Sequence, residues 1–484
     1  MPSAPTPSDV AAKLTPPEPQ AIVVFGATGD LTRRKLLPAL YHLYLEGLLP
    51  PRFAIVGYSR RELSDDDFRK LAHDACMEFG RCRMDRQEWD AFAAALSYVQ
   101  GDFMGAGALA PLRTKLEELD RERGTEGRRF YYAAVPPDTF DHVVTRLEEE
   151  SMTGDARLVI EKPFGSDLES ARELNAILSR GFDESQIFRI DHYLGKETVQ
   201  NILVLRFANA LFEPVWNRRY VDHVELTVAE DIGIEGRGRF YERTGAIRDM
   251  VQTHLFHVLT FLTMEPPVAF EPEDLRTEIV KVLRSMRPVR PEAVVLGQYE
   301  GYTEESDVDP ASTVETFAAL RVEIENWRWA GVPFFLRTGK RLPRRVAEAH
   351  VVFRDVPHEV FESIGAPEIP PNSLSLRIQP DEGISLSITV QRPGFGIELD
   401  VAALDLDFGQ AFGGLELVEA YEHLLLEAMH GDQTMFVRQE AVERSWEVVE
   451  PLIDQQLSPS PYRPGSWGPA EADALIAPRR WMTT

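Results

Sequence analysis

The sequence predicts two domains, a doubly wound α/β domain followed by a larger α+β domain. Over roughly the first 190 residues, continuous apolar runs alternate with amphipathic stretches, which is typical of parallel strands joined by helices. Beyond that point, apolar and polar residues alternate one by one, which is typical of half-buried antiparallel strands. A length of 484 residues is enough for two such hydrophobic cores.

The first domain opens with the apolar run 21–26, which ends in a glycine and predicts a buried parallel strand. A helical pattern of leucines and tyrosines follows and closes near Gly47. A second strand at 53–57 completes a βαβ unit. Further strands are predicted at 129–135 and 157–160, with helices between them. Together these elements predict a Rossmann-like domain with a doubly wound parallel sheet.

The second domain is predicted to be built on a mainly antiparallel, mixed sheet with a few helices. Its predicted strands are 221–228, 317–324, 373–378 and 384–390. The change of pattern places the boundary near residue 191. We therefore expect a loose Pro- and Ser-rich tail at 1–20, a nucleotide-binding domain at 21–191 and a second domain, for substrate binding, at 192–484.

Composition excludes several classes of function. The net charge of −26 argues against a nucleic-acid partner, because a phosphate backbone requires a basic surface. No run approaches the roughly 18 apolar residues of a membrane span, so we expect no membrane association. The N-terminal segment has no signal-peptide pattern, and Cys76 and Cys82 match neither a zinc spacing nor a disulfide framework. These features favour a cytoplasmic protein.

Lysine is rare in the chain, and its placement is informative. The chain has 52 basic residues, most of them arginine, and four lysines lie inside short distinctive segments: Lys35, Lys162, Lys196 and Lys340. An acidic protein that binds anions must concentrate positive charge locally. A retained lysine indicates a task for a compact ammonium group, although chance placement is the alternative interpretation.

A glycine-containing loop follows the first strand, with the residues Gly26, Thr28, Gly29, Asp30 and Leu31. Glycines between a strand and a helix allow backbone N–H groups to approach a pyrophosphate. The spacing differs from the standard GxGxxG fingerprint, and an ordinary turn is the alternative. Its position in the βαβ unit favours the nucleotide interpretation.

The end of the second strand indicates which nucleotide binds. An NAD-binding domain usually has an acidic residue there for the ribose hydroxyl, whereas NADP requires a group that accepts a 2′-phosphate. This chain has Arg60 and Arg61 at that point. Two guanidinium groups favour the phosphate, so we predict NADP as the cofactor.

Two further segments carry the candidate reacting groups. Asp191, His192, Tyr193 and Lys196 lie within six residues at the predicted boundary, and Asp249 and His254 lie in the segment GAIRDMVQTH. Oxidation of an alcohol requires a base near neutral pH, and an imidazole held by a carboxylate meets that need. Spacing alone does not decide which histidine is the base or which aspartate supports it. His257 follows His254 at metal-ligand spacing, but no further ligands accompany the pair, so we predict no metal site.

Five segments, in their order along the chain, resemble the motif series of the glucose-6-phosphate dehydrogenase family: GATGDLTRRKLLPAL, EKPFG, RIDHYLGKE, RDMVQTH and RTGKRL. The resemblance runs from about residue 21 to about residue 469. RIDHYLGKE is highly specific, whereas the glycine loop alone is not. The resemblance implies oxidation of glucose 6-phosphate at C1 to 6-phosphogluconolactone with hydride transfer to NADP, the first step of the oxidative pentose phosphate pathway. It also implies a homodimer or homotetramer that assembles through the domain at 192–484, which then serves both substrate binding and oligomerisation.

The resemblance also assigns roles to residues. It implies that His254 is the general base and Asp191 its carboxylate partner. The substrate phosphate is assigned to His192, Tyr193 and Lys196. Sugar contacts are assigned to Lys162, which also contacts the coenzyme, and to Glu230, Asp249, Lys340 and Gln379. Coenzyme-side positions are Lys35, Asp102, Phe103 and Tyr132.

Two positions depart from the family pattern. Thr253 precedes the implied base where the family usually has asparagine, so we expect a rearranged local hydrogen bond. Glu230 is followed by Asp-Ile-Gly, whereas Pro-containing versions are common in the family. This change lies next to the residue that is expected to contact a sugar hydroxyl. Neither change removes a required chemical group.

Two other functions are compatible with parts of the sequence. A sugar oxidoreductase similar to glucose–fructose oxidoreductase shares the domain plan and a Glu-Lys-Pro segment, but the RIDHYLGKE segment speaks against it. A redox sensor that binds NADP without chemistry is disfavoured by the presence of both Asp191 and His254.

Overall fold

A computed structural model describes residues 15–81, 84–364, 369–413, 418–455 and 457–482. Contacts between residues divide the chain into two compact units. The first comprises Met1–Glu197, Ala269–Arg276 and Leu417–Val442, and the second comprises the remaining segments, Thr198–Val268, Thr277–Glu416 and Glu443–Thr484. The predicted domain boundaries remain a prediction, and most of the predicted tail lies outside the described residues, as does Cys82.

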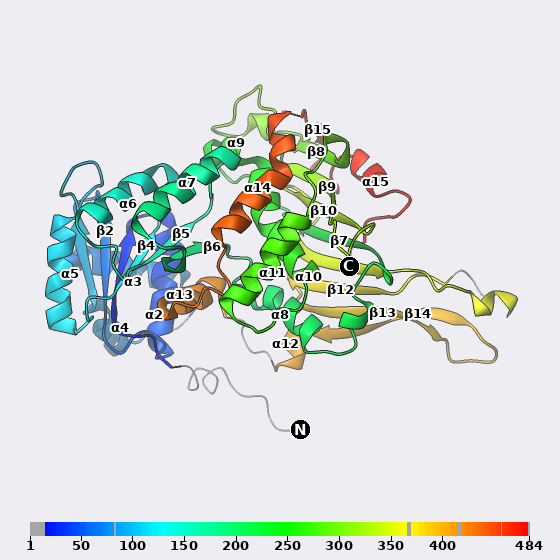
Figure 1. Cartoon of the computed structure of the whole chain (residues 1–484), viewed down its shortest axis with the longest axis horizontal. Helices are drawn as coiled ribbons and strands as arrows, with labels where there is room; N and C mark the ends of the chain where they lie inside the picture. Colours follow the sequence, from blue (N-terminus) through cyan, green and yellow to red (C-terminus); the bar gives the residue numbers. More distant parts are fainter. Residues whose placement is uncertain (1–14, 82–83, 365–368, 414–417, 456, 483–484) are drawn as a thin grey trace. The chain divides into compact units, whose positions relative to one another are not determined.

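The first unit contains a parallel sheet of six strands in the order β3-β2-β1-β4-β5-β6 (Figure 1). The order changes direction at β1, which makes the sheet doubly wound, as predicted. Its strands are β1 Gln20–Phe25, β2 Phe53–Ser59, β3 Leu96–Gln100, β4 Arg129–Ala133, β5 Arg157–Glu161 and β6 Ile187–Ile190. β1 is buried along its whole length, which explains the continuous apolar run in the sequence.

Helices accompany this sheet between its strands. They are the π-helical segment η1 Thr32–Leu36 followed by α2 Leu37–Leu45, then α3 Asp65–Phe79, α4 Arg86–Ala93, α5 Ala110–Arg123, α6 Phe140–Glu149 and α7 Leu168–Gly181. Ser64 begins α3 with a capping box, in which its hydroxyl accepts the Asp67 N–H and the Asp67 carboxylate accepts the Ser64 N–H. Cys76 is buried in α3.

A helix from late in the chain completes the first unit. α13, Ala420–His430, packs against α2. Its buried Glu422 accepts hydrogen bonds from Arg81 at 2.7 Å and lies 2.9 Å from Nδ1 of His42 on α2. This contact raises the pKa of His42. A buried carboxylate with two basic partners therefore holds α13 against the unit.

The second unit contains a mixed sheet of nine strands in the order β14-β13-β12-β11-β7-β10-β9-β8-β15 (Figure 1). The pairs β7–β10 and β8–β15 are parallel, and the other neighbouring pairs are antiparallel. The strands are β7 Val221–Ala229, β8 Val294–Tyr299, β9 Phe317–Glu323, β10 Pro333–Gly339, β11 Val346–Phe353, β12 Ser373–Gln379, β13 Gly383–Gln391, β14 Leu399–Asp407 and β15 Ser460–Tyr462. The predicted fold class is confirmed.

Helices in the remaining parts of the chain are α8 Glu197–Phe207, α9 Gly238–Ala246, the π-helical segment η5 Ile247–Leu255, α10 Phe256–Thr263, α11 Pro272–Ser285, α12 Phe408–Ala411, α14 Gln439–Asp454 and α15 Glu471–Ile476. η5 continues directly into α10, whose side chains are all buried. Within the described residues, no helix combines the length and the apolar character needed to cross a bilayer.

Candidate active site

The predicted residues of the first unit share one edge of its parallel sheet. Each follows or closes the carboxyl end of a different strand, and parallel strands place these ends side by side. Ligands of doubly wound sheets bind at this edge. By strand, the residues are Gly26 to Leu31 after β1, Arg60 and Arg61 after β2, Asp102 and Phe103 after β3, Tyr132 in β4, Lys162 after β5, and Asp191 to Lys196 after β6.

Gly26 shapes the loop after β1. Its φ of +83° lies in the left-handed region, and a Cβ at this position would come within 2.1 Å of the Ala134 carbonyl oxygen. Only glycine fits here. The Gly26 N–H donates to the carbonyl of Tyr58, and the Gly26 carbonyl accepts the N–H of Gly29 and the hydroxyl of Thr32. The loop is therefore a tight turn with no side chain over its backbone, which is the form needed to cradle a pyrophosphate.

Arg60 and Arg61 lie exposed at the end of β2, next to this loop. The hydroxyls of Thr28 and Ser59 are 3.1 Å apart, which links the two segments. The Tyr98 hydroxyl donates to the Arg61 carbonyl and fixes the arginine-bearing turn. Within the parts of the chain described here, neither arginine side chain has an ion pair, so both guanidinium groups can receive a 2′-phosphate.

Two charged residues of the helix start have partners within the first unit. Asp30 accepts a hydrogen bond from Arg34 at 2.9 Å and lies exposed. Lys35 forms an ion pair with Glu419, just before α13. Lys35 lies in η1, and Leu31 is the N-cap residue of that segment. π-helical segments are often found at functional sites, and this one carries a predicted coenzyme-side lysine.

Asp102 and Phe103 have contacts that fix the loop after β3. The Asp102 carboxylate accepts the N–H of Met104, and its carbonyl accepts the hydroxyl of Tyr58 at 2.7 Å. The Phe103 ring packs against the rings of Phe25 and Tyr58, at centroid distances of 5.4 and 5.3 Å. These contacts show how the loop is held, and the coenzyme-side roles of both residues stay predictions.

A carboxyl group bound by two tyrosines lies beside Lys162. Glu161 closes β5 and accepts hydrogen bonds from the hydroxyls of Tyr132 and Tyr421. Desolvation raises the pKa of Glu161 to about 7, and the nearby Asp191 charge adds to the increase, while both hydroxyls and Lys162 oppose it. Tyr132, predicted on the coenzyme side, is buried and directed to this carboxyl group.

The turn after β6 gathers the predicted phosphate-binding groups. A carboxylate oxygen of the buried Asp191 accepts the N–H of Tyr193 at 3.0 Å, and its carbonyl accepts the N–H of Leu194. The Lys196 ammonium lies 3.8 Å from the centre of the Tyr193 ring, and the His192 ring centre is 5.1 Å from that ring. The short sequence spacing thus becomes a compact group of two basic side chains around one phenol.

Three predicted sugar-binding residues share one edge of the second sheet. Glu230 follows β7, Lys340 follows β10, and Gln379 closes β12, and these three strands run in the same direction. Lys340 is 2% exposed and forms an ion pair with Glu230. Its ammonium lies 5.1 Å from the centre of the Tyr241 ring, and its carbonyl accepts the hydroxyl of Tyr462. The backbone and the ammonium of Lys340 are both held in place.

The segment η5 carries Asp249 and His254. Burial raises the pKa of the Tyr241 hydroxyl, and the Asp249 charge adds to the rise, which places Asp249 near the group formed by Tyr241 and Lys340. His254 is 1% exposed. The Thr253 hydroxyl donates to the Gln252 side-chain carbonyl at 2.5 Å, which is the local hydrogen bond at this departure from the family pattern.

Glu315 holds the start of η5. Its carboxylate accepts the Ile247 N–H at 3.0 Å, and its carbonyl accepts the Ala246 N–H. Burial raises the pKa of Glu315, while the Ile247 N–H and the Arg248 charge lower it. At Gly245, where φ is +60°, a Cβ would come within 2.4 Å of this carboxylate. A carboxylate at a helix N-terminus is favourable, and it fixes the first turn of the segment that carries Asp249.

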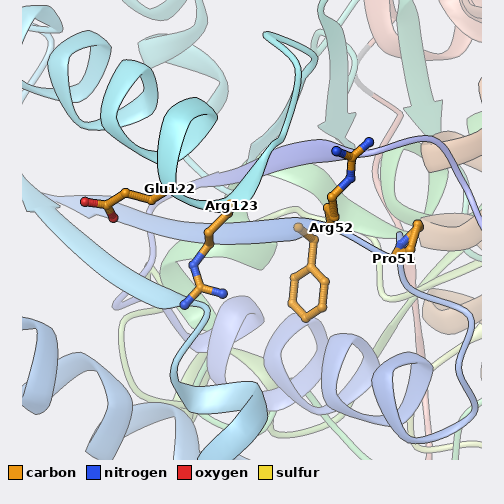
Figure 2. A pocket seen from close by; sticks show the side chains of 5 residues that line it. Pro51, Arg52, Glu122 and Arg123 are labelled. Atoms are coloured by element: carbon orange, nitrogen blue, oxygen red, sulfur yellow. The ribbon is translucent and has the colours of Figure 1, made fainter.

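A separate cavity lies at the opposite edge of the first sheet. It measures about 410 Å³ and is lined by Pro51, Arg52, Phe53, Glu122 and Arg123 (Figure 2). Phe53 begins β2, so the cavity lies away from the strand ends that carry the predicted residues. Both arginines are engaged, Arg52 with Glu126 and Arg123 with the Ala94 carbonyl. This cavity is therefore no candidate for the coenzyme.

Sequence reasoning did not assign roles to Glu161, Tyr241, Glu315, Glu419 or Tyr421. Glu161 is the first residue of the EKPFG motif and directly precedes Lys162. That position was the only feature of the sequence that pointed to Glu161. The partners of the others lie far away along the chain. Tyr421, for example, reaches a carboxyl group 260 positions earlier. No periodicity or spacing connects such residues.

These features define a class. A doubly wound parallel sheet, with a tight glycine loop after its first strand and two arginines after its second, is typical of dinucleotide-dependent oxidoreductases.

Comparison with known proteins identifies the family. The model of the glucose-6-phosphate dehydrogenase NAD binding domain matches residues 23–201, and that of the C-terminal domain matches residues 203–482. The chain belongs to the glucose-6-phosphate dehydrogenase family. Glucose-6-phosphate 1-dehydrogenase 2 of Mycobacterium tuberculosis is 44% identical over 95% of this chain and 93% of its own length.

Solved structures agree with this assignment. Glucose-6-phosphate 1-dehydrogenase from Mycobacterium avium is 40% identical with a TM-score of 0.86, covering 96% of this chain and 99% of its own. A glucose-6-phosphate dehydrogenase in complex with its substrate glucose-6-phosphate is 36% identical with a TM-score of 0.90, covering 97% of this chain and 100% of its own. The predicted enzyme class, a glucose-6-phosphate dehydrogenase that uses NADP, is confirmed, and the rival sugar oxidoreductase is not favoured.

Glu161 predicts a pH effect on stability. Its pKa is about 7 in the folded protein against an ordinary value of 4.5, so between these values the unfolded chain loses a proton that the folded protein keeps. The free energy of unfolding therefore falls as pH rises through this window. Glu161→Gln removes this contribution. Thermal unfolding should show a smaller loss of Tm for the variant than for the wild type from about pH 5 to about pH 8. Equal losses of Tm in the wild type and in Glu161→Gln would contradict the raised pKa of Glu161. Glu117→Gln, at an exposed position, is the control.

Glu315 predicts a separable effect on catalysis. Glu315→Ala removes the acceptor for the Ile247 N–H and should lower kcat/KM about tenfold or more, because Asp249 and His254 depend on the start of η5. Glu315→Gln keeps a side-chain oxygen and should restore most of the loss. Steady-state kinetics of both variants, with exposed Glu300→Ala as control, test the role. Equal loss in the Gln and Ala variants would show that hydrogen bonding to Ile247 is not the cause.

Proposed function

We propose that the predicted site residues of this chain carry out the family reaction at C1 of the sugar. His254 removes the proton of the C1 hydroxyl, and Asp191 stabilises the resulting imidazolium. His192, Tyr193 and Lys196 bind the substrate phosphate. Lys162, Glu230, Asp249, Lys340 and Gln379 bind the sugar. NADP, when bound, supplies the acceptor for the hydride that leaves C1.

The coenzyme side of this proposal rests on the fit of the loop to a dinucleotide. Only glycine fits at position 26, where a Cβ would collide with the Ala134 carbonyl oxygen, so the loop forms the tight turn that a pyrophosphate site requires. Arg60 and Arg61 offer guanidinium groups to a 2′-phosphate. Thr28 and Gly29 lie in the same strand-to-helix connection as Gly26, and Lys35 lies in η1, the helical segment that follows it. This loop is the single observation that carries the assignment of the nucleotide site.

The sugar side rests on the group around Lys340. A nearly inaccessible ammonium paired with Glu230 can donate to one sugar hydroxyl while the carboxylate accepts from another. Asp249 adds a second carboxylate next to Tyr241. Hydroxyl-rich ligands need such neighbouring donors and acceptors.

We also propose a homodimer or homotetramer in the cytoplasm. Strand β14 exposes the apolar residues Val401, Leu404 and Leu406, and it lies at the end of the strand order. An exposed apolar edge strand is a surface that proteins usually cover.

The reaction is tested by absorbance of NADPH after the protein is mixed with NADP and glucose 6-phosphate. Parallel reactions replace the sugar phosphate by free glucose and NADP by NAD. We expect reduction only with the phosphate ester and mainly with NADP. Reduction with free glucose alone would contradict the phosphate site, and equal rates with NAD would contradict the role of Arg60 and Arg61.

His254→Asn should lower kcat about 10²-fold or more while the affinity for glucose 6-phosphate is largely kept, because a general base acts in the transition state. Equilibrium binding and steady-state rates separate the two effects. Normal turnover with lost binding would assign His254 to substrate binding instead.

Lys196→Ala should mainly raise KM for glucose 6-phosphate, because it removes one cationic donor to a dianion. Arg321→Ala, an exposed arginine paired with Glu323, is the matched control for loss of one positive charge. An unchanged KM for glucose 6-phosphate would contradict the assignment of Lys196 to phosphate binding.

A further inference from the structure

The second unit has a pocket at the sheet edge opposite Glu230 and Lys340. It measures about 700 Å³, a size suited to a small molecule. Its walls come from three places: the loop before β7, the turn between β9 and β10, and the residue after β11. β7 and β10 start at this edge and β11 ends there. Seven strand residues span roughly 20 Å, which separates the pocket from the proposed sugar site.

Three arginines line this pocket: Arg218, Arg219 and Arg354. In the part of the chain that the structure describes, none of the three has an ion pair. Nearby Arg328, by contrast, pairs with both Glu213 and Glu265. In a chain of net charge −26, three neighbouring guanidinium groups without carboxylate partners form a local positive centre that attracts anions.

Backbone carbonyls, rather than carboxylates, position two of these side chains. The Arg354 guanidinium donates to the Arg218 carbonyl at 3.2 Å, and that of Arg218 donates to the Ala330 carbonyl at 3.4 Å. Asn217 fixes the loop, since its side-chain oxygen accepts the Arg219 N–H at 3.0 Å. The guanidinium groups are thus oriented without being neutralised, and each keeps further N–H donors for a ligand.

An indole completes the pocket. Trp327 lines it and is 96% exposed, and Tyr220 beside it is 44% exposed. A fully exposed indole leaves a large apolar face in water, and such a face stacks on planar rings. Nucleic-acid bases stack on aromatic side chains, and their phosphates bind arginine in paired hydrogen bonds.

We propose that this pocket binds a nucleoside triphosphate, with the base on Trp327 and the phosphates on Arg218, Arg219 and Arg354. This site lies at the edge of the second sheet opposite Glu230 and Lys340, and it does not depend on the residue roles proposed above.

The test is equilibrium binding of ATP to the full chain, with NADPH in excess to occupy the coenzyme site. Isothermal titration calorimetry should give one ATP per chain, and ATP should quench tryptophan fluorescence in the wild type but much less in Trp327→Phe. Arg219→Ala and Arg354→Ala should each weaken binding about tenfold or more, because each removes a charged hydrogen-bond donor. Arg321→Ala is the matched control and should bind as the wild type does.

Turnover with glucose 6-phosphate and NADP should be unchanged in the pocket variants, which shows that they fold. Tripolyphosphate and adenosine separate the two halves of the ligand, and each should bind more weakly than ATP. Tripolyphosphate binding as tightly as ATP would overturn the nucleotide assignment. Failure of ATP to bind in the presence of NADPH, or binding unaltered in both arginine variants, would overturn the site.

Discussion

Parallel pairing of β1 with its neighbours β2 and β4 is the constraint on which the site depends. Because parallel strands all end at one edge, the register that pairs Phe25 with Tyr58 and with Ala133 also brings the glycine loop beside the arginine turn and the strand carrying Tyr132. A slip of one residue would reverse the faces of β1 and move Gly26 away from the carbonyl that excludes a side chain there. The second unit uses the same device, since β7, β10 and β12 end together.

Charge in this acidic chain is arranged in two ways. At the site, cations are held against carboxylates or rings, as in Lys340 with Glu230 and Lys196 over Tyr193. Away from the site, Arg337 is buried between the rings of Trp467 and Trp481, and desolvation lowers its pKa to about 10. Positive charge inside the protein is thus kept in paired or aromatic surroundings.

The architecture could be predicted from the sequence because strands buried on both faces have long apolar runs, as β1 does. Short strands such as β3 and β6 have too few residues to show a period, and β10 carries Arg337 in an otherwise apolar run. The motif residues could be identified because they lie close together in sequence. Glu315 could not, because it acts through a backbone N–H 68 positions away, and the π-helical form of η1 and η5 leaves no signature in residue spacing.

The docking of α13 on α2 has a consequence for how the protein is made. The ribosome delivers the chain from its N-terminus, and domains generally fold as their residues emerge. The first unit, however, lacks Glu422 and Tyr421 until segment 417–442 has been synthesised, after more than 200 residues of other sequence. During that interval His42, Arg81 and Glu161 are without these partners. The nucleotide-binding unit therefore reaches its final form only when nearly the whole chain has been translated, so a protein truncated before α13 would lack these stabilising contacts.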